Sequence, residues 1–283
     1  MISDKKGQVT VFIILGVLIL AVFASYFFFK SFTTTESLSA QEIIVDTTPI
    51  QLYVEGCLEK TAQDTINFIS LQGGYYHLPK TYLDYSFVKI PYYFDDGNEN
   101  FPSKENIASE MEKYFKINLP KCINNFLAFK SKGYLIQEGE IEPEIYFGSQ
   151  VLFNIDYPLL ITKGDPIINN EIIDYSNNFN SITEQSGKIK ELNKFSTQVN
   201  LDFDQIYSII NDTVLEHRKN INSVPIGHLS LSAYENDYKF KLNYPEDDIV
   251  VYSLIFDDYK IKNENYSFVF ASKYNWEDLK IES

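Results

Sequence analysis

The stretch VTVFIILGVLILAVFASYFFF, residues Val9–Phe29, decides how this chain is organised. It contains no charged side chain, and its 21 residues would form a helix of roughly 31 Å. That length matches a hydrocarbon core of about 30 Å. Lys5 and Lys6 precede the stretch and Lys30 follows it. We therefore expect a single N-terminal transmembrane helix whose partner is the lipid bilayer, through residues 9–29.

The basic flank sets the expected orientation. Lys5 and Lys6 favour a cytoplasmic N-terminus, so that the protein is located in the cell membrane, single-pass, with its C-terminal domain extracellular. A cleaved secretory signal is the alternative, because Val22-Phe23-Ala24 resembles a cleavage site. The apolar run continues through Phe29, where a signal turns polar, and this favours a retained anchor.

The segment Lys5-Lys6-Gly7-Gln8, followed by the apolar run, resembles the class III signal of archaeal type IV pilin-like proteins. The resemblance covers only residues 5–20. It implies a processing site between Gly7 and Gln8 and a helix that packs into a filament core. Thr10 and Phe12 stand where that family usually has Ser and Glu, and the Glu helps to place subunits in a filament. A basic flank before a membrane span explains the same residues without the family.

The net charge and the aromatic content limit the classes of molecule that we expect the protein to bind. The net charge of −15 argues against a nucleic-acid partner, because phosphate contacts supply most of the affinity for nucleic acids. The 21 Tyr and 22 Phe fit either a coding bias or a surface built for contact, since Tyr gives a large contact area with few rotatable bonds.

Cys57 and Cys122 are the only cysteines. In an exported domain such a pair predicts a disulfide, here between residues 65 positions apart and worth roughly 4 kcal/mol in the chain-entropy model. Two buried, unpaired thiols are the alternative. Two cysteines are too few for a structural zinc site.

The expected domain organisation has three parts. Residues 1–30 form the cytoplasmic flank and transmembrane helix, 31–48 a linker or helix extension, and 49–283 an extracytoplasmic domain with a sub-boundary near 134–180. The predicted fold class of this exported domain is α+β, with several helices packed on antiparallel sheet, because helical and strand patterns come in blocks.

Particular elements follow from the periodicity and the turn residues. Helices are expected at 49–72, at 103–133 with an interruption at Pro120, and at 181–219 with a break at 200–202. Strands are expected within 75–94, at 151–157, at 159–163 and in a meander over 228–274 that begins at His228.

No catalytic or cofactor motif was found, so neither catalytic residues nor a cofactor is predicted. A weak calcium candidate is the turn with Asp95, Asp96, Asn98 and Glu99, which lacks the spacing of an EF-hand loop. His217 lies near a predicted helix end, where a structural role is favoured. Two further residues match the glycan acceptor pattern, Asn211 and Asn265.

The sequence therefore predicts a membrane-anchored extracytoplasmic surface protein that acts by contact with a protein or envelope partner, without catalysis. One alternative is a pilin-like filament subunit. The other is an anchored extracytoplasmic hydrolase using paired carboxylates, which requires ionisable groups converging in a pocket.

Overall fold

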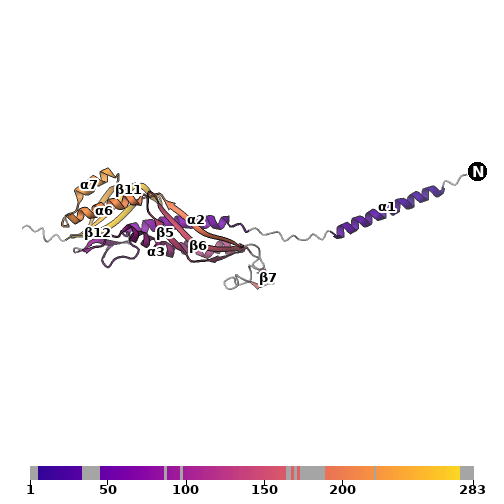
Figure 1. The fold of residues 1–283 in the computed structure, drawn as a ribbon, viewed down its shortest axis with the longest axis horizontal. Coiled ribbons are helices and arrows are strands. Elements are labelled where there is room, and N and C mark those ends of the chain that lie inside the picture. The colour runs from indigo at the N-terminus through magenta and orange to yellow at the C-terminus, as the bar shows by residue number, and fades with distance from the viewer. Residues whose placement is uncertain are drawn as a thin grey trace, which may run out of the picture. The chain divides into compact units, whose positions relative to one another are not determined.

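The structure is a computed structural model that describes residues 6–33, 45–85, 88–95, 98–163, 167–168, 171–172, 189–219 and 221–274. The chain divides into two compact units, Met1–Ile43 and Ile44–Ser283. The first contains helix α1 (Lys6–Thr33). The second, called the body from here on, contains the remaining described helices and strands (Figure 1).

The prediction of a transmembrane helix over residues 9–29 is wrong. Helix α1 covers that range, but within the described part of the chain no helix is long and apolar enough to cross a membrane. The fold class is corrected to an α+β body that follows one apolar helix.

The body has its elements in the following order. The helices are α2 (Thr48–Leu71), α3 (Lys104–Ile123), the 3₁₀ turn η1 (Asn124–Phe126), α4 (Leu127–Lys130), α6 (Phe203–Lys219) and α7 (Ile226–Glu235). The strands are β1 (Tyr82–Tyr85), β2 (Val88–Asp95), β3 (Asn98–Glu99), β4 (Tyr134–Glu138), β5 (Glu142–Tyr146), β6 (Val151–Lys163), β7 (Ile167–Ile168), β8 (Glu171–Ile172), β9 (Lys190–Val199), β10 (Lys239–Glu246), β11 (Ile249–Ile261) and β12 (Glu264–Lys273).

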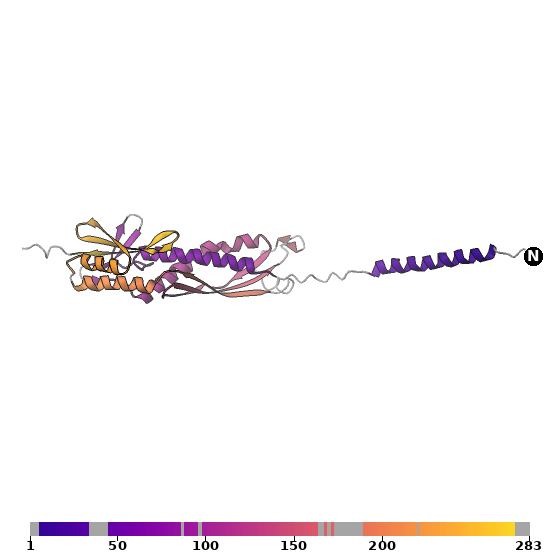
Figure 2. The same ribbon diagram turned by 90° about the horizontal axis from the view of Figure 1, so that it is seen from above.

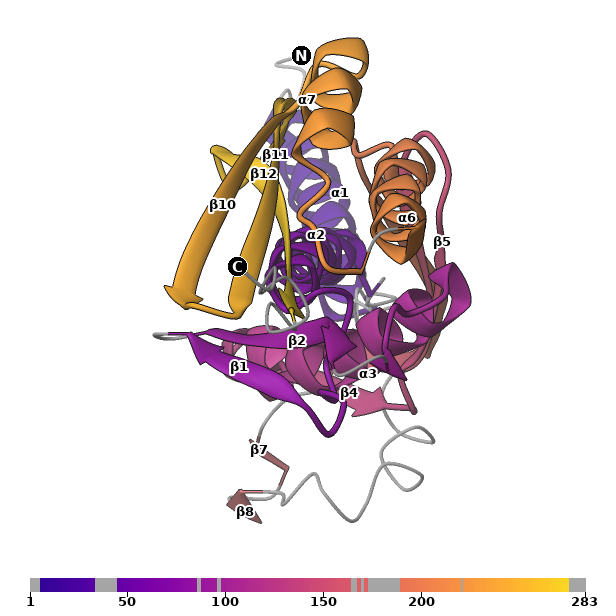
Figure 3. The same cartoon turned by 90° about the vertical axis from the view of Figure 1, so that its left-hand side faces the viewer.

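Helix α2 runs through the middle of the body (Figure 3). Its fully buried apolar side chains recur at intervals of three and four residues and form a continuous buried face, namely Ile50, Val54, Leu58, Ala62, Ile66 and Ile69. This face contacts α3, β9 and β12, and each large apolar side chain buried in this way stabilises the body by roughly 1.5–3 kcal/mol. The helix ends at Gly73 and Gly74, which have φ of +56° and +85°, so the helix predicted for 49–72 is confirmed.

One sheet combines strands from the early part of the body's sequence with strands from its last part. Its strand order is β1-β2-β12-β11-β10, with β3 beside β2. Strands β10, β11 and β12 form the antiparallel meander predicted for this region, and β2 joins it parallel to β12, with Tyr92 opposite Ala271. Phe268 and Phe270 of β12 enter the larger core, while Val269 and Ala271, which alternate with them, are buried in a smaller apolar cluster on the other face of the sheet.

The second sheet is built around the long strand β6. Strands β4 and β5 pair with one of its edges and β9 with the other, all antiparallel. The two strands predicted on either side of Pro158 are one continuous strand, and its register with β9 shifts between Asp156 and Leu159. Proline lacks an N–H, and such an irregularity tolerates it.

The helix predicted over 181–219 is only partly present. Residues 190–199 form strand β9, because they pair with β6 along their length, and residues 181–188 lie outside the described residues. Helix α6 begins at Phe203, where Asp202 Oδ1 accepts a hydrogen bond of 3.0 Å from the backbone N–H of Gln205. The break predicted at 200–202 is therefore the start of the helix.

Two further local predictions differ from the structure. His228 does not begin a strand but lies in the first turn of α7, whose buried residues Leu229 and Ser232 are three apart, as in a helix. Helix α3 continues through Pro120 and ends at Ile123, where Asn124 and Asn125 take left-handed backbone angles. Figure 2 shows α6 lengthwise along the body with α7 beside it.

Candidate functional site

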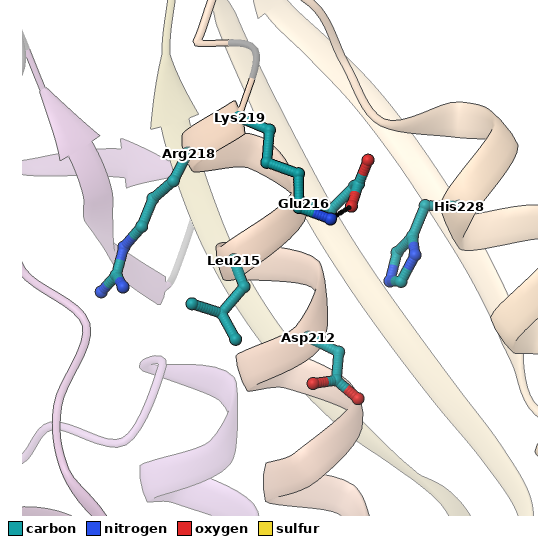
Figure 4. A pocket seen from close by; sticks show the side chains of 6 residues that line it. All are labelled: Asp212, Leu215, Glu216, Arg218, Lys219 and His228. Atoms are coloured by element: carbon teal, nitrogen blue, oxygen red, sulfur yellow. Dashed lines mark hydrogen bonds and ion pairs between the residues drawn. The ribbon is translucent and has the colours of Figure 1, made fainter.

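A groove lies between α6 and α7. It has a volume of about 570 Å³ and six lining residues, Asp212, Leu215, Glu216, Arg218, Lys219 and His228 (Figure 4). It opens to solvent beside the six-stranded sheet, so its shape suits a side chain or short segment of another molecule better than an enclosed small molecule.

Helix α6 forms one wall of the groove, because the helical repeat brings several of its lining residues to one side. Asp212, Glu216 and Lys219 recur at intervals of four and three on one side of α6, while Ile210 and Val214 on the other side are buried in the core. The facing wall comes from α7, where His228 lies in the first turn. Figure 4 shows the Asp212 carboxylate and the His228 imidazole pointing into the gap between the helices, while Arg218 points away from it.

Most of the charges around the groove are neutralised within the body. Glu216 accepts a hydrogen bond of 2.5 Å from Lys219 Nζ, and this bond holds the pKa of Glu216 below its usual value. Arg218 is ion-paired with Glu99 of β3, with its Nε donating over 2.6 Å.

Two polar groups in the groove have no partner among the described residues. Asp212 is exposed and forms no ion pair with any residue that the structure describes. The Nε2 atom of His228 is shielded from solvent and has no hydrogen-bond partner among the described residues. A buried nitrogen without a partner is costly, so the groove offers an acceptor or donor position that a bound group would satisfy.

Large apolar side chains are exposed on the two helices that form the groove and in the turn between them. Five large ones on α6, on α7 and in the turn between them are exposed, namely Leu215, Ile221, Ile226, Leu231 and Tyr234. The exposed fraction reaches 59% at Leu231 and 88% at Tyr234. We call these five residues, together with the groove, the α6–α7 surface. Exposed apolar groups gathered in this way are typical of protein interaction sites.

A second hollow lies on the sheet around β6. It has a volume of about 480 Å³, and its walls include Glu142, Glu144, Asp156 and Lys194. The strand register places Glu142 directly opposite Asp156, and Asp156 opposite Lys194. Carboxylates therefore lie together here, and the hydrolase alternative stays a prediction. Within the described chain no group of three or more His, Cys, Asp or Glu side chains is arranged to hold a metal ion.

A chain of buried polar rings lies beneath α6. His217 is only 3% exposed, stacks on Phe94 at 4.1 Å between ring centroids, and its Nδ1 is 2.9 Å from the hydroxyl of Tyr274. That hydroxyl also hydrogen-bonds to Tyr252. Burial lowers the pKa of His217 to about 4, although the nearby Glu99 acts in the opposite direction. The imidazole is therefore neutral at pH 7.

His77 has a partner that lies far from it in the sequence. Glu110 Oε2 accepts hydrogen bonds from the backbone N–H groups of Tyr76 (3.0 Å) and His77 (2.6 Å) and lies 3.2 Å from His77 Nδ1. Burial tends to raise the pKa of Glu110, but the His77 N–H, Lys113 and the Tyr76 N–H together lower it. This carboxylate fixes the loop after α2. Only a contact between residues more than 30 positions apart reveals it.

The disulfide prediction is confirmed. Cys57 of α2 and Cys122 of α3 are bonded, with their Cα atoms 5.7 Å apart. The bond joins the central helix to its neighbour. Because both cysteines are oxidised, the alternative of two free thiols does not apply.

The calcium candidate is not assembled among the described residues. Asp96 lies outside them. Glu99 is ion-paired with Arg218, and the side-chain amide of Asn98 donates a hydrogen bond to the backbone carbonyl of Asp95.

The other candidate residues belong to three different elements. Gly7 and Gln8 belong to the backbone of α1. Asn211 is half-buried on α6, and the Oγ1 of Thr213 in its acceptor motif donates to the carbonyl of Ile209. Asn265 is exposed at the start of β12 and hydrogen-bonds to Asp257. The glycan acceptor role of both asparagines stays a prediction.

Comparison with known proteins gave no match to a family model, a curated protein or a solved structure. The pilin-like signal suggested by residues 5–20 therefore stays a prediction as well.

Proposed function

We propose that the protein is exported and acts by contact, with the α6–α7 surface binding another protein or a component of the cell envelope. The observation that carries this proposal is the set of five exposed apolar side chains on α6, on α7 and in the turn between them, together with a groove that contains a buried His228 nitrogen without a partner among the described residues. Such a surface loses apolar exposure when a partner covers it, and roughly 25 cal/mol per Å² favours that burial.

The disulfide supports the proposed location. Cys57 and Cys122 are bonded, and such bonds persist in oxidising compartments outside the cytoplasm. The net charge of −15 fits the same proposal, because it keeps the exported body soluble and disfavours nucleic acid as the partner.

Site-specific cross-linking in the native cells tests the contact. The photoreactive residue p-benzoylphenylalanine would replace Tyr234 in the full chain, and in a matched control it would replace Tyr146, an exposed tyrosine on β5. We expect illumination to give a discrete adduct from position 234 and none from position 146. The same adduct from both positions, or none from position 234, would refute a contact at the α6–α7 surface.

A pilin-like filament subunit is the second candidate, and the observation that favours it is α1. The large apolar side chains described in α1, between residues 14 and 27, are exposed, and exposed apolar surface of this kind favours a partner that covers it. Packing against the same helix of other copies would cover them. This candidate predicts a mature N-terminus at Gln8 and material that pellets as filaments. A natural protein that keeps Met1 and sediments as a monomer would rule it out.

A further inference from the structure

We propose that the groove of the α6–α7 surface takes up a basic side chain, an arginine or lysine, from the partner protein. This inference rests on the proposed contact function and names the chemistry that the partner presents. Its starting point is the pair of groups on opposite walls of the groove, Asp212 and His228, which point into the same gap (Figure 4).

Asp212 and His228 both suit a ligand that donates hydrogen bonds. Asp212 offers carboxylate oxygens and forms no ion pair with the described residues. His228 Nε2, on the facing wall, has no partner among the described residues, and it accepts a hydrogen bond in the tautomer that carries its proton on Nδ1. A guanidinium or ammonium group carries several donors and a positive charge, which suits an unpaired carboxylate beside a nitrogen acceptor.

The remaining lining residues fit the stem of such a side chain. Leu215 supplies an apolar wall, and Leu231 lies one helical turn beyond His228 on α7. Arginine and lysine bury their methylene stems along apolar surface while the charged head is bonded. An acidic side chain would instead meet Asp212 and Glu216 and be repelled.

The cations near the groove do not occupy this position. Lys219 is bonded to Glu216, and Arg218 points away toward Glu99. The net charge of −15 also draws a basic partner toward the body at long range. Charge complementarity therefore favours a basic segment over a second copy of this acidic chain.

A titration of the full chain with small probes tests the chemistry. N-acetylarginine amide and N-acetyllysine amide are the cationic probes, and N-acetylcitrulline amide is the neutral isostere of the first. The His228 ring resonances report binding by NMR. We expect saturable shifts with a Kd in the millimolar range for at least one cationic probe, and a Kd at least five-fold weaker for citrulline.

Two variants complete the experiment. Asp212→Asn should weaken the cationic probe at least five-fold, whereas Asp258→Asn, which removes an exposed carboxylate of β11 outside the groove, should leave its Kd unchanged. Equal shifts from the arginine and citrulline probes, or an Asp212→Asn variant that binds like the wild type, would overturn the inference.

Cross-linking separates this inference from the proposed function. With p-benzoylphenylalanine at position 234, Asp212→Asn should reduce the adduct at least five-fold. If the adduct forms equally well in the variant, the contact function stands and the basic side chain is wrong. If the wild-type background gives no adduct, the contact function itself fails, whatever the probes show.

Discussion

Acidification should destabilise the body through one buried imidazole, His217. Its pKa is about 4 in the folded protein because of burial, whereas an unfolded chain has the ordinary value near 6.5. Between these two values the unfolded state binds a proton that the folded state does not. Stability therefore falls as pH falls through this window.

The magnitude follows from the two pKa values. At pH 7.5 both states are neutral at this site, and at pH 5 the unfolded state is almost fully protonated. The linkage relation then gives a loss of about 2 kcal/mol in the free energy of unfolding over that interval. Glu110, whose folded pKa is lowered, loses its contribution only as pH falls below the usual range of a carboxyl, so the interval above pH 5 isolates the histidine.

Urea unfolding of the full chain at pH 7.5 and pH 5 measures this loss. His217→Gln serves as the control, because glutamine keeps a polar partner for the Tyr274 hydroxyl but does not titrate. We expect the variant to be less stable at pH 7.5 and to lose about 2 kcal/mol less than the wild type on acidification. If wild type and variant lose the same free energy, the buried imidazole is not the cause and the reasoning is refuted.

Three further perturbations test the packing of the body. Replacing both Cys57 and Cys122 by alanine should lower the free energy of unfolding by about 2–4 kcal/mol and abolish any effect of reductant on the melting temperature, measured by circular dichroism. Gly74→Ala should cost about 1–3 kcal/mol, because φ is +85° and the new Cβ would lie 2.8 Å from a buried isoleucine of α3; an unchanged urea midpoint would contradict this. Ile66→Ala, at a fully buried position of α2, should cost about 2–5 kcal/mol, whereas Leu52→Ala on the same helix, where the residue is 62% exposed, should cost less than about 0.5 kcal/mol.

The elements predicted correctly are those whose signals are local. Helix α2 has apolar residues at helical spacing, Pro49 in its first turn and a glycine pair at its end, and the meander β10–β12 alternates between clear turns. In α7 the alternation of Leu229 and Leu231 with serines is typical of a strand. Contact of Leu229 and Ser232 with the core selects the helix instead.

The parts missed by sequence reasoning depend on distant contacts. Strand β9 carries a pattern that also fits a helix, and its pairing with β6 decides its conformation. The groove joins Asp212 to His228, which were assigned to a helix and a strand, so no spacing rule connects them. The disulfide is the exception, since two cysteines allow only one pairing.

The parallel pairing of β2 with β12 has a consequence for how the protein is made. β1 and β3 give β2 local partners, but Tyr92 and Phe94 of β2 also pair with Ala271 and Ser272, so during synthesis this parallel pairing cannot form until β12 has emerged from the ribosome. Contacts of such wide sequence separation slow folding. A sheet that is completed only by β12 suits the export proposed above, because a chain that has not yet completed its fold can still pass through a secretion channel.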